Sequence, residues 1–425
     1  MRRIVLAACI ALVAAHRSHA GDVDPALGET SERTDPGKTV ALSLPTNWKA
    51  GGRGQVFGSL ETWAGTFDQQ PWERPHASID VRLASSWSRA ELAWWGSVHP
   101  WPGERKDGSL RRGDGWVEEV RNNPERHETG LYRVVEQGGR AYVLVAETHE
   151  KRFPKIEDKL RAVFDTFRAV ASPPLFTPPA GYAASMQGGA RVVTDTKDVK
   201  MLQRVLADHA AAWKVMTQLL PGARAIADPP VVVVCDADQA YSDITLPTAE
   251  RYAVGCDMIP HLRIVIARVS AKEAGFFDFS LRRFTGLQYS QYFFGGRAPD
   301  WVESGLAAFP VAAIARGKPD KPPPDVLAAA KAAAAKLGGS LDTLIATRRV
   351  LLHDAPAEEF DMAAYAWHCF FRYGPGAKTY GARYQRYLDD LRRTGAPDEA
   401  LKAWDDVDKE TLGSEFLAWI AAWKP

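Results

Sequence analysis

The first half of the chain is dominated by short runs in which apolar and polar residues alternate, the pattern of half-buried strands. One such run starts at Thr39 in TVALSLPTNWKA and ends in a Pro-Thr-Asn turn. The stretch LYRVVEQGGRAYVLVAETHE contains two more, on either side of the glycine turn at residues 137–139, and predicts a β-hairpin. An amphipathic helix that covers the sheet is predicted over residues 155–167, because apolar residues recur there at helical spacing. These residues are Ile156, Leu160, Val163, Phe164 and Phe167.

Longer periodic segments follow in the second half. The proline-rich stretch ASPPLFTPPAGY cannot continue a helix, so we predict a linker at residues 173–180. A long helix is predicted over residues 197–220, where His209 lies in an apolar stripe and is interpreted as a core histidine. The runs PPVVVVCD and LRIVIAR predict buried strands joined by a loop. The alanine-rich run VLAAAKAAAAKLGG is a strong helix former that Gly338 and Gly339 end.

These patterns predict an α+β protein with two domains. The first is an antiparallel-sheet α/β sandwich over residues 39–172, and the polar residues 21–38 before it are predicted to be disordered. The second spans residues 181–345 and continues into a mainly helical C-terminal part over residues 346–425. With 425 residues, of which 46% are hydrophobic and 25% charged, the chain is long enough to bury both cores.

The N-terminus has the pattern of an export signal over residues 1–20. Two arginines precede an apolar run, and the small residues SHA end at Ala20, so we expect cleavage there and a periplasmic or extracellular protein. The sequence LAAC, ending at Cys9, also resembles the lipobox of bacterial lipoproteins. The apolar stretch before Cys9 is short and continues past it, which favours the unanchored form. No other apolar run approaches the roughly 20 residues that cross a bilayer, so no transmembrane segment is expected.

Charge and cysteine content narrow the function classes. The net charge is +1 and no basic stripe is present, which argues against a nucleic-acid partner. Cys235 ends an apolar strand and is predicted to be a buried thiol. Spacing alone does not decide whether Cys256 and Cys369 form a disulfide. The chain has no Cys-x-x-Cys pair, so a thiolate zinc site is not expected.

The two ends of the first domain, ALSLPTNW and KLRAVFDTFR, resemble the extrinsic photosystem P-protein family over about residues 39–168. The resemblance implies an antiparallel sheet with helices that serves binding more often than catalysis. This half is also rich in tryptophan, and exposed tryptophans such as Trp94 and Trp95 would stack on sugar rings. A role in filling the core is the simpler interpretation of these tryptophans.

The second domain resembles the peptidase-MA-like, or gluzincin, clan of zinc metallopeptidases over about residues 181–423. The resemblance rests on the order of predicted elements, on APDWVESGLAAF, and on YAWHCFFRYG and YQRYLDDLRRTG, which resemble the C-terminal helices of bacterial members of unknown function. In that clan one helix carries His-Glu-x-x-His and a second carries Trp-Leu-x-Glu-Gly-Leu-Ala. The two histidines grip zinc, the glutamate between them accepts a proton from the bound water, and the distal glutamate completes the site. Pro310 follows the second motif and is expected to kink or end its helix.

This chain departs from the clan at each of those positions. In FFDFSLRRFTGLQYSQYFFGG, the first histidine, the glutamate and the second histidine are replaced by Thr285, Gly286 and Tyr289. Ser304 stands at the distal ligand position, and Glu303 lies one residue before it. Because one step along a helix rotates a side chain by about 100°, we expect Glu303 to point away from the cavity. We therefore predict no metal, no cofactor and no catalytic residue.

Other catalytic motifs are missing from the sequence. The dipeptides His127-Glu128 and His149-Glu150 lack a second histidine four residues after the first, and we interpret them as surface residues. The chain contains no His-x-x-x-His pair, no Gly-x-Ser-x-Gly elbow and no phosphate-binding Gly-x-x-x-x-Gly-Lys-Ser/Thr loop.

Three hypotheses about function follow. The favoured one is an exported, catalytically inactive relative of zinc peptidases that binds a peptide or protein partner in a retained cleft lined by Tyr292, Trp301 and Glu303. The second is an active metallopeptidase in which Glu303 joins histidines brought from afar. These histidines would be His261, His353 and His368. The third is a carbohydrate- or envelope-binding protein that acts through its tryptophan-rich first domain.

Overall fold

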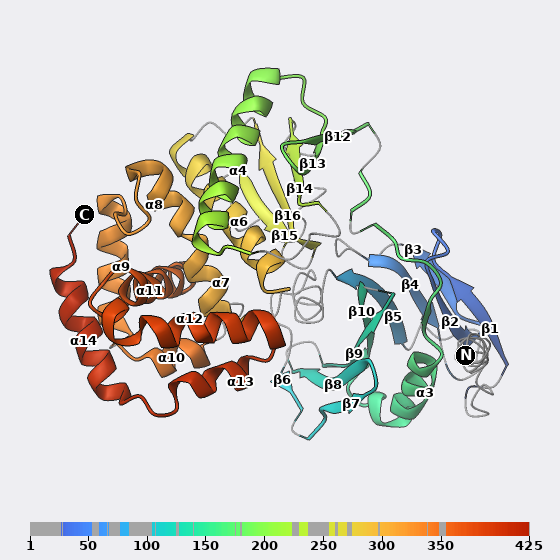
Figure 1. The fold of residues 1–425 in the computed structure, drawn as a ribbon. Coiled ribbons are helices and arrows are strands. Elements are labelled where there is room, and N and C mark those ends of the chain that lie inside the picture. The colour runs from blue at the N-terminus through green and yellow to red at the C-terminus, as the bar shows by residue number, and fades with distance from the viewer. Residues whose placement is uncertain are drawn as a thin grey trace, which may run out of the picture.

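A computed structural model gives the protein an α+β fold, as predicted, with a β-rich first region and a mainly helical second region (Figure 1). It describes residues 27, 29–52, 59–65, 67, 77–84, 104–106, 108–124, 127–138, 140–174, 176–178, 181–222, 229–236, 255–259, 262–269, 274–295, 298–337, 339–347 and 354–424. The predicted export signal with Cys9, and the pair Trp94 and Trp95, lie outside these residues.

The first region contains two antiparallel sheets. Its strands are β1 Thr30–Thr34, β2 Val40–Pro45, β3 Lys49–Gly52, β4 Ser59–Gly65, β5 Ala77–Ala84, β6 Glu104–Arg105, β7 Arg111–Gly113, β8 Trp116–Asn123, β9 Glu128–Gln137, β10 Arg140–His149 and β11 Arg168–Ala169. The smaller sheet has the order β1-β2-β11. The larger has the order β3-β4-β5-β10-β9-β8-β6, with β7 also paired to β8.

The predicted hairpin and helix of this region are confirmed. β9 and β10 pair from Gln137 opposite Arg140 to Glu128 opposite His149 at the open end of the hairpin. The helix α3 (Phe153–Asp165) follows directly and packs on one face of the sheet. Its apolar side chains share a core with those of β5, β9 and β10, because alternate strand residues face the same side.

Residues 29–38 are ordered, which corrects the prediction of a disordered segment over residues 21–38. β1 pairs with β2 along all five of its residues. Asp35 is buried and fixes the turn between the two strands, because its carboxylate accepts hydrogen bonds from the backbone of Gly37, Thr39 and Val40. The polar sequence TSERT has no apolar pattern from which a strand could be predicted. Backbone pairing at a sheet edge holds it in place.

The second region begins with a five-stranded mixed sheet. Its strands are β12 Ala183–Gln187, β13 Ala190–Thr194, β14 Val231–Cys235, β15 Cys256–Ile259 and β16 Ile264–Arg268, in the order β12-β13-β14-β16-β15. β14 and β16 are the two predicted strands, and they pair in parallel at the centre of the sheet. The long predicted helix, α4 (Val199–Leu219), packs beside α6 on one face. Phe176 from the proline-rich linker packs on the other face.

The rest of the second region is helical. Its helices are α6 Ala274–Phe293, α7 Asp300–Ala307, α8 Phe309–Arg316, α9 Pro324–Lys336, α10 Leu341–Ala346, α11 Asp354–Arg372, α12 Gly376–Thr394, α13 Pro397–Leu401, the 3-10 turn η5 Lys402–Trp404, and α14 Lys409–Ala422. They enclose the largest hydrophobic core of the described residues. Pro310 lies in the first turn of α8, so the break between α7 and α8 falls where the sequence places it. In the described part of the chain, no helix combines the length and apolarity that a bilayer span requires.

Three cysteines are described, and all are free and buried. Cys256 belongs to the core between the sheet and its helices, whereas Cys369 belongs to the helical core, so the disulfide between them that the sequence left open does not form. Cys235 is the predicted buried thiol, and burial raises its pKa to about 11.

Candidate functional site

The helix α6 presents Thr285 and Tyr289, which the resemblance aligned with two zinc-binding histidines, to the interior. Thr285 is fully buried, and its hydroxyl donates to the carbonyl of Leu281 one turn earlier (2.8 Å). The hydroxyl of Tyr289 donates to the carbonyl of Leu220 at the end of α4 (3.0 Å). The ring of Tyr289 packs edge-on against Trp213 of α4, at 4.9 Å between centroids. Both hydroxyls therefore serve the packing of α6 rather than an open site, and burial raises the pKa of Tyr289.

Gly286, which the resemblance aligned with a catalytic glutamate, lies against backbone. A Cβ atom placed on Gly286 would lie 2.8 Å from the carbonyl oxygen of Ala307 and 3.0 Å from its Cα atom. Real Cβ atoms essentially never approach backbone atoms so closely, so α6 and α7 touch here without space for any side chain. A glycine in the middle of a helix is costly, and close approach to a second helix is the reason for it here.

The contact at Gly286 also defines which face of α7 lies against α6. Ala307 makes this contact, and Glu303 lies four residues earlier on the same helical face. Glu303 is only 1% exposed, in the layer between the two helices. The sequence offset predicted that Glu303 points away from the cavity, and the structure buries Glu303 on the face of α7 that lies toward α6. The sequence motif predicts where α7 lies along the chain but not which of its faces lies against α6. The packing of Gly286 on Ala307 determines that face.

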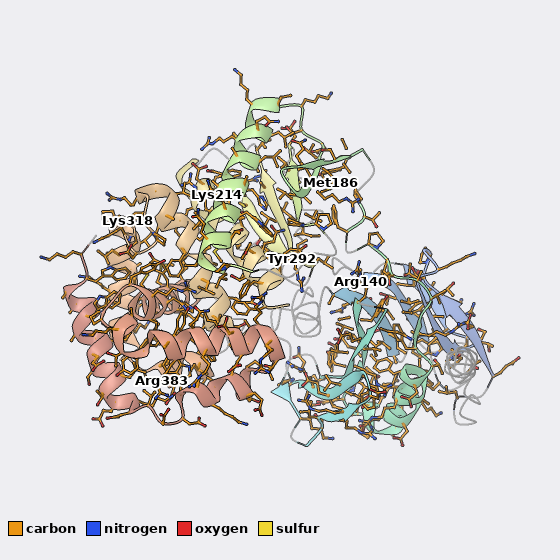
Figure 2. The ribbon with its side chains drawn as sticks, viewed as in Figure 1. Arg140, Met186, Lys214, Tyr292, Lys318 and Arg383 are labelled. Carbon is orange, nitrogen blue, oxygen red and sulfur yellow. The ribbon has the colours of Figure 1, made fainter. Side chains whose placement is uncertain are left out.

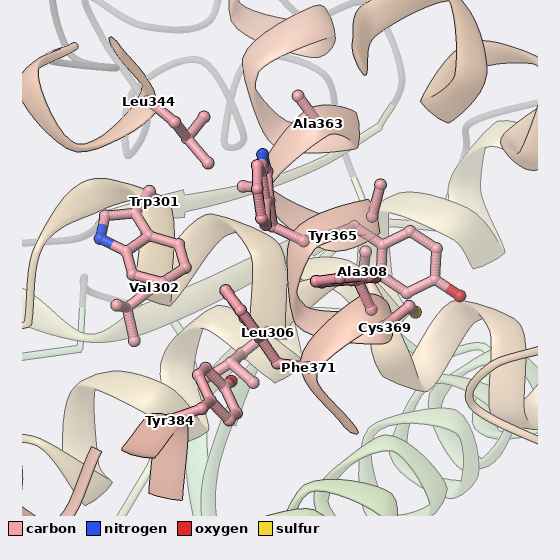
Figure 3. Packing of buried hydrophobic residues seen from close by; sticks show 14 of the residues in the cluster. Trp301, Val302, Leu306, Ala308, Leu344, Ala363, Tyr365, Cys369, Phe371 and Tyr384 are labelled. Atoms are coloured by element: carbon pink, nitrogen blue, oxygen red, sulfur yellow. The ribbon is translucent and has the colours of Figure 1, made fainter. Parts of the chain in front are cut away.

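The opposite face of α7 packs on α11. A Cβ atom on Gly305 would lie 2.7 Å from the carbonyl carbon of Ala364, so these two helices are also in close contact. Trp301 stacks on His368 with 4.8 Å between centroids and 10° between planes. Figure 3 shows Trp301 within this apolar packing, near Leu344. Trp301 is therefore a core residue at 1% exposure, and the prediction that it lines a cleft is wrong.

Of the three histidines that the second hypothesis names as zinc ligands, His368 is the one that the structure describes. Both of its ring nitrogens form hydrogen bonds. Nδ1 accepts a hydrogen bond from the hydroxyl of Tyr384, and Nε2 donates to the carbonyl of Trp301 (3.2 Å). Burial lowers the pKa of His368 to about 3, so the ring is neutral. No lone pair on this ring is directed at a metal, and the other two histidines of that hypothesis, His261 and His353, lie outside the described residues.

The remaining sequence-predicted residues are distributed over different surfaces. Tyr292, at 9% exposure, lies near the end of α6, where the guanidinium of Arg263 covers its ring at 4.8 Å (Figure 2). Ser304 is 5% exposed on α7. Thr285 and Tyr289 lie on the face of α6 toward α4, whereas Gly286 lies on the face toward α7.

Sequence reasoning missed two polar contacts that hold α6 in place. Gln288 is fully buried, and its amide donates to the carbonyls of Val231 and Arg263 at 3.0 and 2.7 Å. Its Oε1 accepts from His209 (2.9 Å), which confirms His209 as a core histidine whose pKa burial lowers. Arg283 forms an ion pair with the buried Asp361 of α11. The contacts of Gln288 could have been predicted, because it is a glutamine on an otherwise apolar helix face.

In the two His-Glu dipeptides of the first region, His127 and His149 are exposed, and Glu128 and Glu150 are half-buried. His127 has a side-chain exposure of 67%, and its Nδ1 lies 3.2 Å from Oε1 of Glu150. The rings of His127 and His149 face each other, with 6.3 Å between centroids. Among the residues that the structure describes, no three His, Cys, Asp or Glu side chains form a group arranged to hold a metal ion.

Comparison with solved structures gives distant likenesses, two of which follow. No family model matches the chain, and no curated protein matches it. The chain is similar to the solution structure of cyanobacterial PsbP (CyanoP) from Synechocystis sp. PCC 6803, at 13% identity and a TM-score of 0.24, over 36% of this chain and 96% of that one. It is also similar to a crystal structure from Bacteroides thetaiotaomicron VPI-5482, at 10% identity and a TM-score of 0.23, over 61% of this chain and 76% of that one. Neither likeness is close enough to carry a conclusion about fold or function.

Proposed function

We propose that the chain is an exported, catalytically inactive relative of the gluzincin peptidases that binds a peptide or protein partner. The observation that carries the proposal is the contact of Gly286 with Ala307. A general base must stand beside a metal-bound water, and this contact leaves no space for the base, the water or the metal between α6 and α7.

The replacements on either side of Gly286 support the same conclusion. A threonine hydroxyl and a tyrosine hydroxyl do not replace two imidazoles as zinc ligands, because zinc in proteins takes thiolate, imidazole and carboxylate donors. Here Thr285 and Tyr289 also use their hydroxyls to satisfy backbone carbonyls in a dry interior. Losing those bonds would cost stability, so the two residues are suited to packing.

The partner-binding part of the proposal rests on β12, because Trp301 and Glu303 are in the interior. β12 is an edge strand of its sheet, and four of its five side chains are exposed. Its sequence AASMQ has no charge and no proline, and it pairs with β13 without a bulge. Charged residues, proline or a β-bulge usually protect an exposed edge strand, since an unprotected edge pairs with another extended chain. An extended peptide that adds to β12 through backbone hydrogen bonds is the ligand that this edge fits.

Two measurements test the proposal. Incubating the purified protein with unstructured peptides and added Zn²⁺, followed by mass spectrometry, is expected to give no cleavage. Cleavage that a chelator stops would overturn the inactive assignment.

Fluorescence anisotropy of a panel of labelled extended peptides tests the edge strand. Met186, 60% exposed on β12 (Figure 2), is replaced with lysine, and Val199, 66% exposed at the start of α4, provides the matched control. Met186→Lys is expected to weaken peptide binding about tenfold, because a charge on an edge strand opposes strand addition. Val199→Lys is expected to leave binding unchanged. Equal affinities for all three proteins would remove β12 as the binding site.

A further inference from the structure

The two His-Glu dipeptides, far apart in sequence, meet at the open end of the β9–β10 hairpin. His127 comes just before β9, and His149 is the last residue of β10. The N–H of Glu150 donates to the carbonyl of His127 (2.8 Å), which joins the two dipeptides through the backbone. Their imidazole rings then face each other, with 6.3 Å between centroids and 21° between planes.

The hydrogen bond of the His127 ring leaves a donor atom for a metal. Nδ1 of His127 lies 3.2 Å from Oε1 of Glu150. When that nitrogen carries the proton, it donates to the carboxylate, and the lone pair of Nε2 is available. Metal-binding histidines almost always donate their other ring N–H to a carboxylate or carbonyl in this way. Glu150 is thus placed to orient the ring of His127.

We propose that His127 and His149 bind a divalent transition-metal ion of the zinc–copper class, with Glu150 as the residue that positions His127. Imidazole nitrogen is a preferred donor for these ions. With metal–nitrogen distances of about 2.0–2.1 Å, two imidazoles on one tetrahedral ion have their centroids roughly 5 Å apart. The observed 6.3 Å is close to that separation, but the rings face each other with 21° between planes, so at least one ring turns before both nitrogens point at one ion.

The site forms when the ion arrives, because no group of three ligands is arranged in advance among the described residues. The ring of His149 is held by a long hydrogen bond, 3.3 Å, from the N–H of Lys151 to Nδ1, which is weak enough to give way. Exposed side chains change rotamer within picoseconds to nanoseconds, so the ring rotation that turns both nitrogens toward one ion is fast. Water completes the coordination. The bound ion links the start of β9 to the end of β10, and it stabilises the folded state because the unfolded chain lacks the pair.

Calorimetric titration tests the proposal, with the protein purified without a histidine tag, freed of metal with a chelator and dialysed. Zn²⁺ alone is the probe, and Mg²⁺ is the control ion because it prefers oxygen ligands. The variants are His127→Asn, His149→Gln and Glu150→Gln. Asparagine suits residue 127, whose φ of 54° lies in the left-handed region that asparagine tolerates. Glu358→Gln, an exposed carboxylate on α11, is the matched control.

The wild type and Glu358→Gln are expected to bind one Zn²⁺ per chain at this site, with a rise in melting temperature, and not to bind Mg²⁺. Either histidine variant is expected to lose this binding, and Glu150→Gln is expected to weaken it about tenfold. Unchanged affinity in either histidine variant, or no saturable binding by the wild type, would overturn the proposal. Zinc that remains in the double histidine variant would instead implicate another site and bear on the inactive-peptidase proposal. Equal melting temperatures without metal show that the variants are folded.

Discussion

The protein carries polar side chains in two contrasting settings. In the second region, Thr285 and Tyr289 of α6 and His368 of α11 are buried, and each bonds to a backbone carbonyl in the interior. At the open end of the β9–β10 hairpin, His127 and His149 are exposed, and their rings face each other. The residues that were aligned with the peptidase motif are thus used in packing. The two histidines that belong to no complete motif are accessible to a ligand.

The difference shows why residue type alone does not identify a site. A buried polar group must find a partner inside the protein, and once it has one it stabilises the core and is unavailable for chemistry. An exposed group keeps its water and exchanges it for a ligand at small cost. Substitutions in the buried contact between the helices, or of the exposed histidine pair, therefore test this comparison.

The largest effect is expected when the glutamate of the peptidase motif is restored. Gly286→Glu forces a side chain and a charge into the contact with Ala307, and we expect a loss of roughly 4–8 kcal/mol of unfolding free energy. Gly286→Ala adds only a methyl group and is expected to cost about 1–3 kcal/mol. Urea denaturation followed by circular dichroism measures both.

The matched control for these variants is Gly381→Ala on α12. A Cβ atom there would meet its nearest atom, the carbonyl oxygen of Phe371, at 3.4 Å, an ordinary contact. We expect this change to stabilise the helix by about 0.5–1 kcal/mol. A Gly286→Glu protein as stable as the wild type would show that the two helices are not closed against each other.

The next largest effect is expected from pH. The unfolded chain protonates His368 below about pH 6.5, whereas the folded protein resists protonation until about pH 3. The unfolded state therefore binds more protons between these values, and stability falls as the pH drops from about 6.5 toward 3, by at most roughly 5 kcal/mol.

Comparison with His368→Gln isolates this effect from the other titrating groups. The variant is less stable at neutral pH, since it loses the stacking on Trp301, but its unfolding free energy is expected to fall less steeply with acid. Urea denaturation at several pH values gives both curves. Identical slopes for the two proteins would mean that His368 is not buried in its neutral form.

The smallest effect is expected from reducing agents. Cys235, Cys256 and Cys369 are free thiols in the interior, and burial raises the pKa of each. Dithiothreitol is therefore expected to leave the melting temperature unchanged, and a thiol-specific label is expected to react with these three cysteines only after unfolding. A fall in melting temperature on reduction would reveal a disulfide and contradict the separation of the two cores.

Much of the fold could be predicted from the sequence because a strong periodic pattern of apolar residues indicates which side of an element is buried. The β9–β10 hairpin, α3, α4 and the central strands β14 and β16 each have a long or strongly apolar pattern. The strands β1, β12 and β15 escaped prediction, since they are only five, five and four residues long and two of them carry little apolar pattern. Their position in a sheet depends on backbone pairing with distant residues.

The candidate site was accessible only in part. The absence of zinc ligands at 285, 286 and 289 follows from residue types alone. The rotation of α7 does not, because Gly286 and Ala307 meet through tertiary packing and not through any local pattern. The ion pair of Arg283 with Asp361 and the meeting of His127 with His149 have the same origin. Contacts between residues far apart in sequence leave no periodic signal.

Zinc content is the most direct test of the claim that the peptidase-like half has no metal site. The measurement is elemental analysis of the purified His127→Asn, His149→Gln double variant, produced with ample zinc so that an intact site would be filled. We expect far less than one zinc per chain and no peptide hydrolysis. One tightly held zinc per chain in this variant, with hydrolysis that stops when a chelator removes it, would contradict the account.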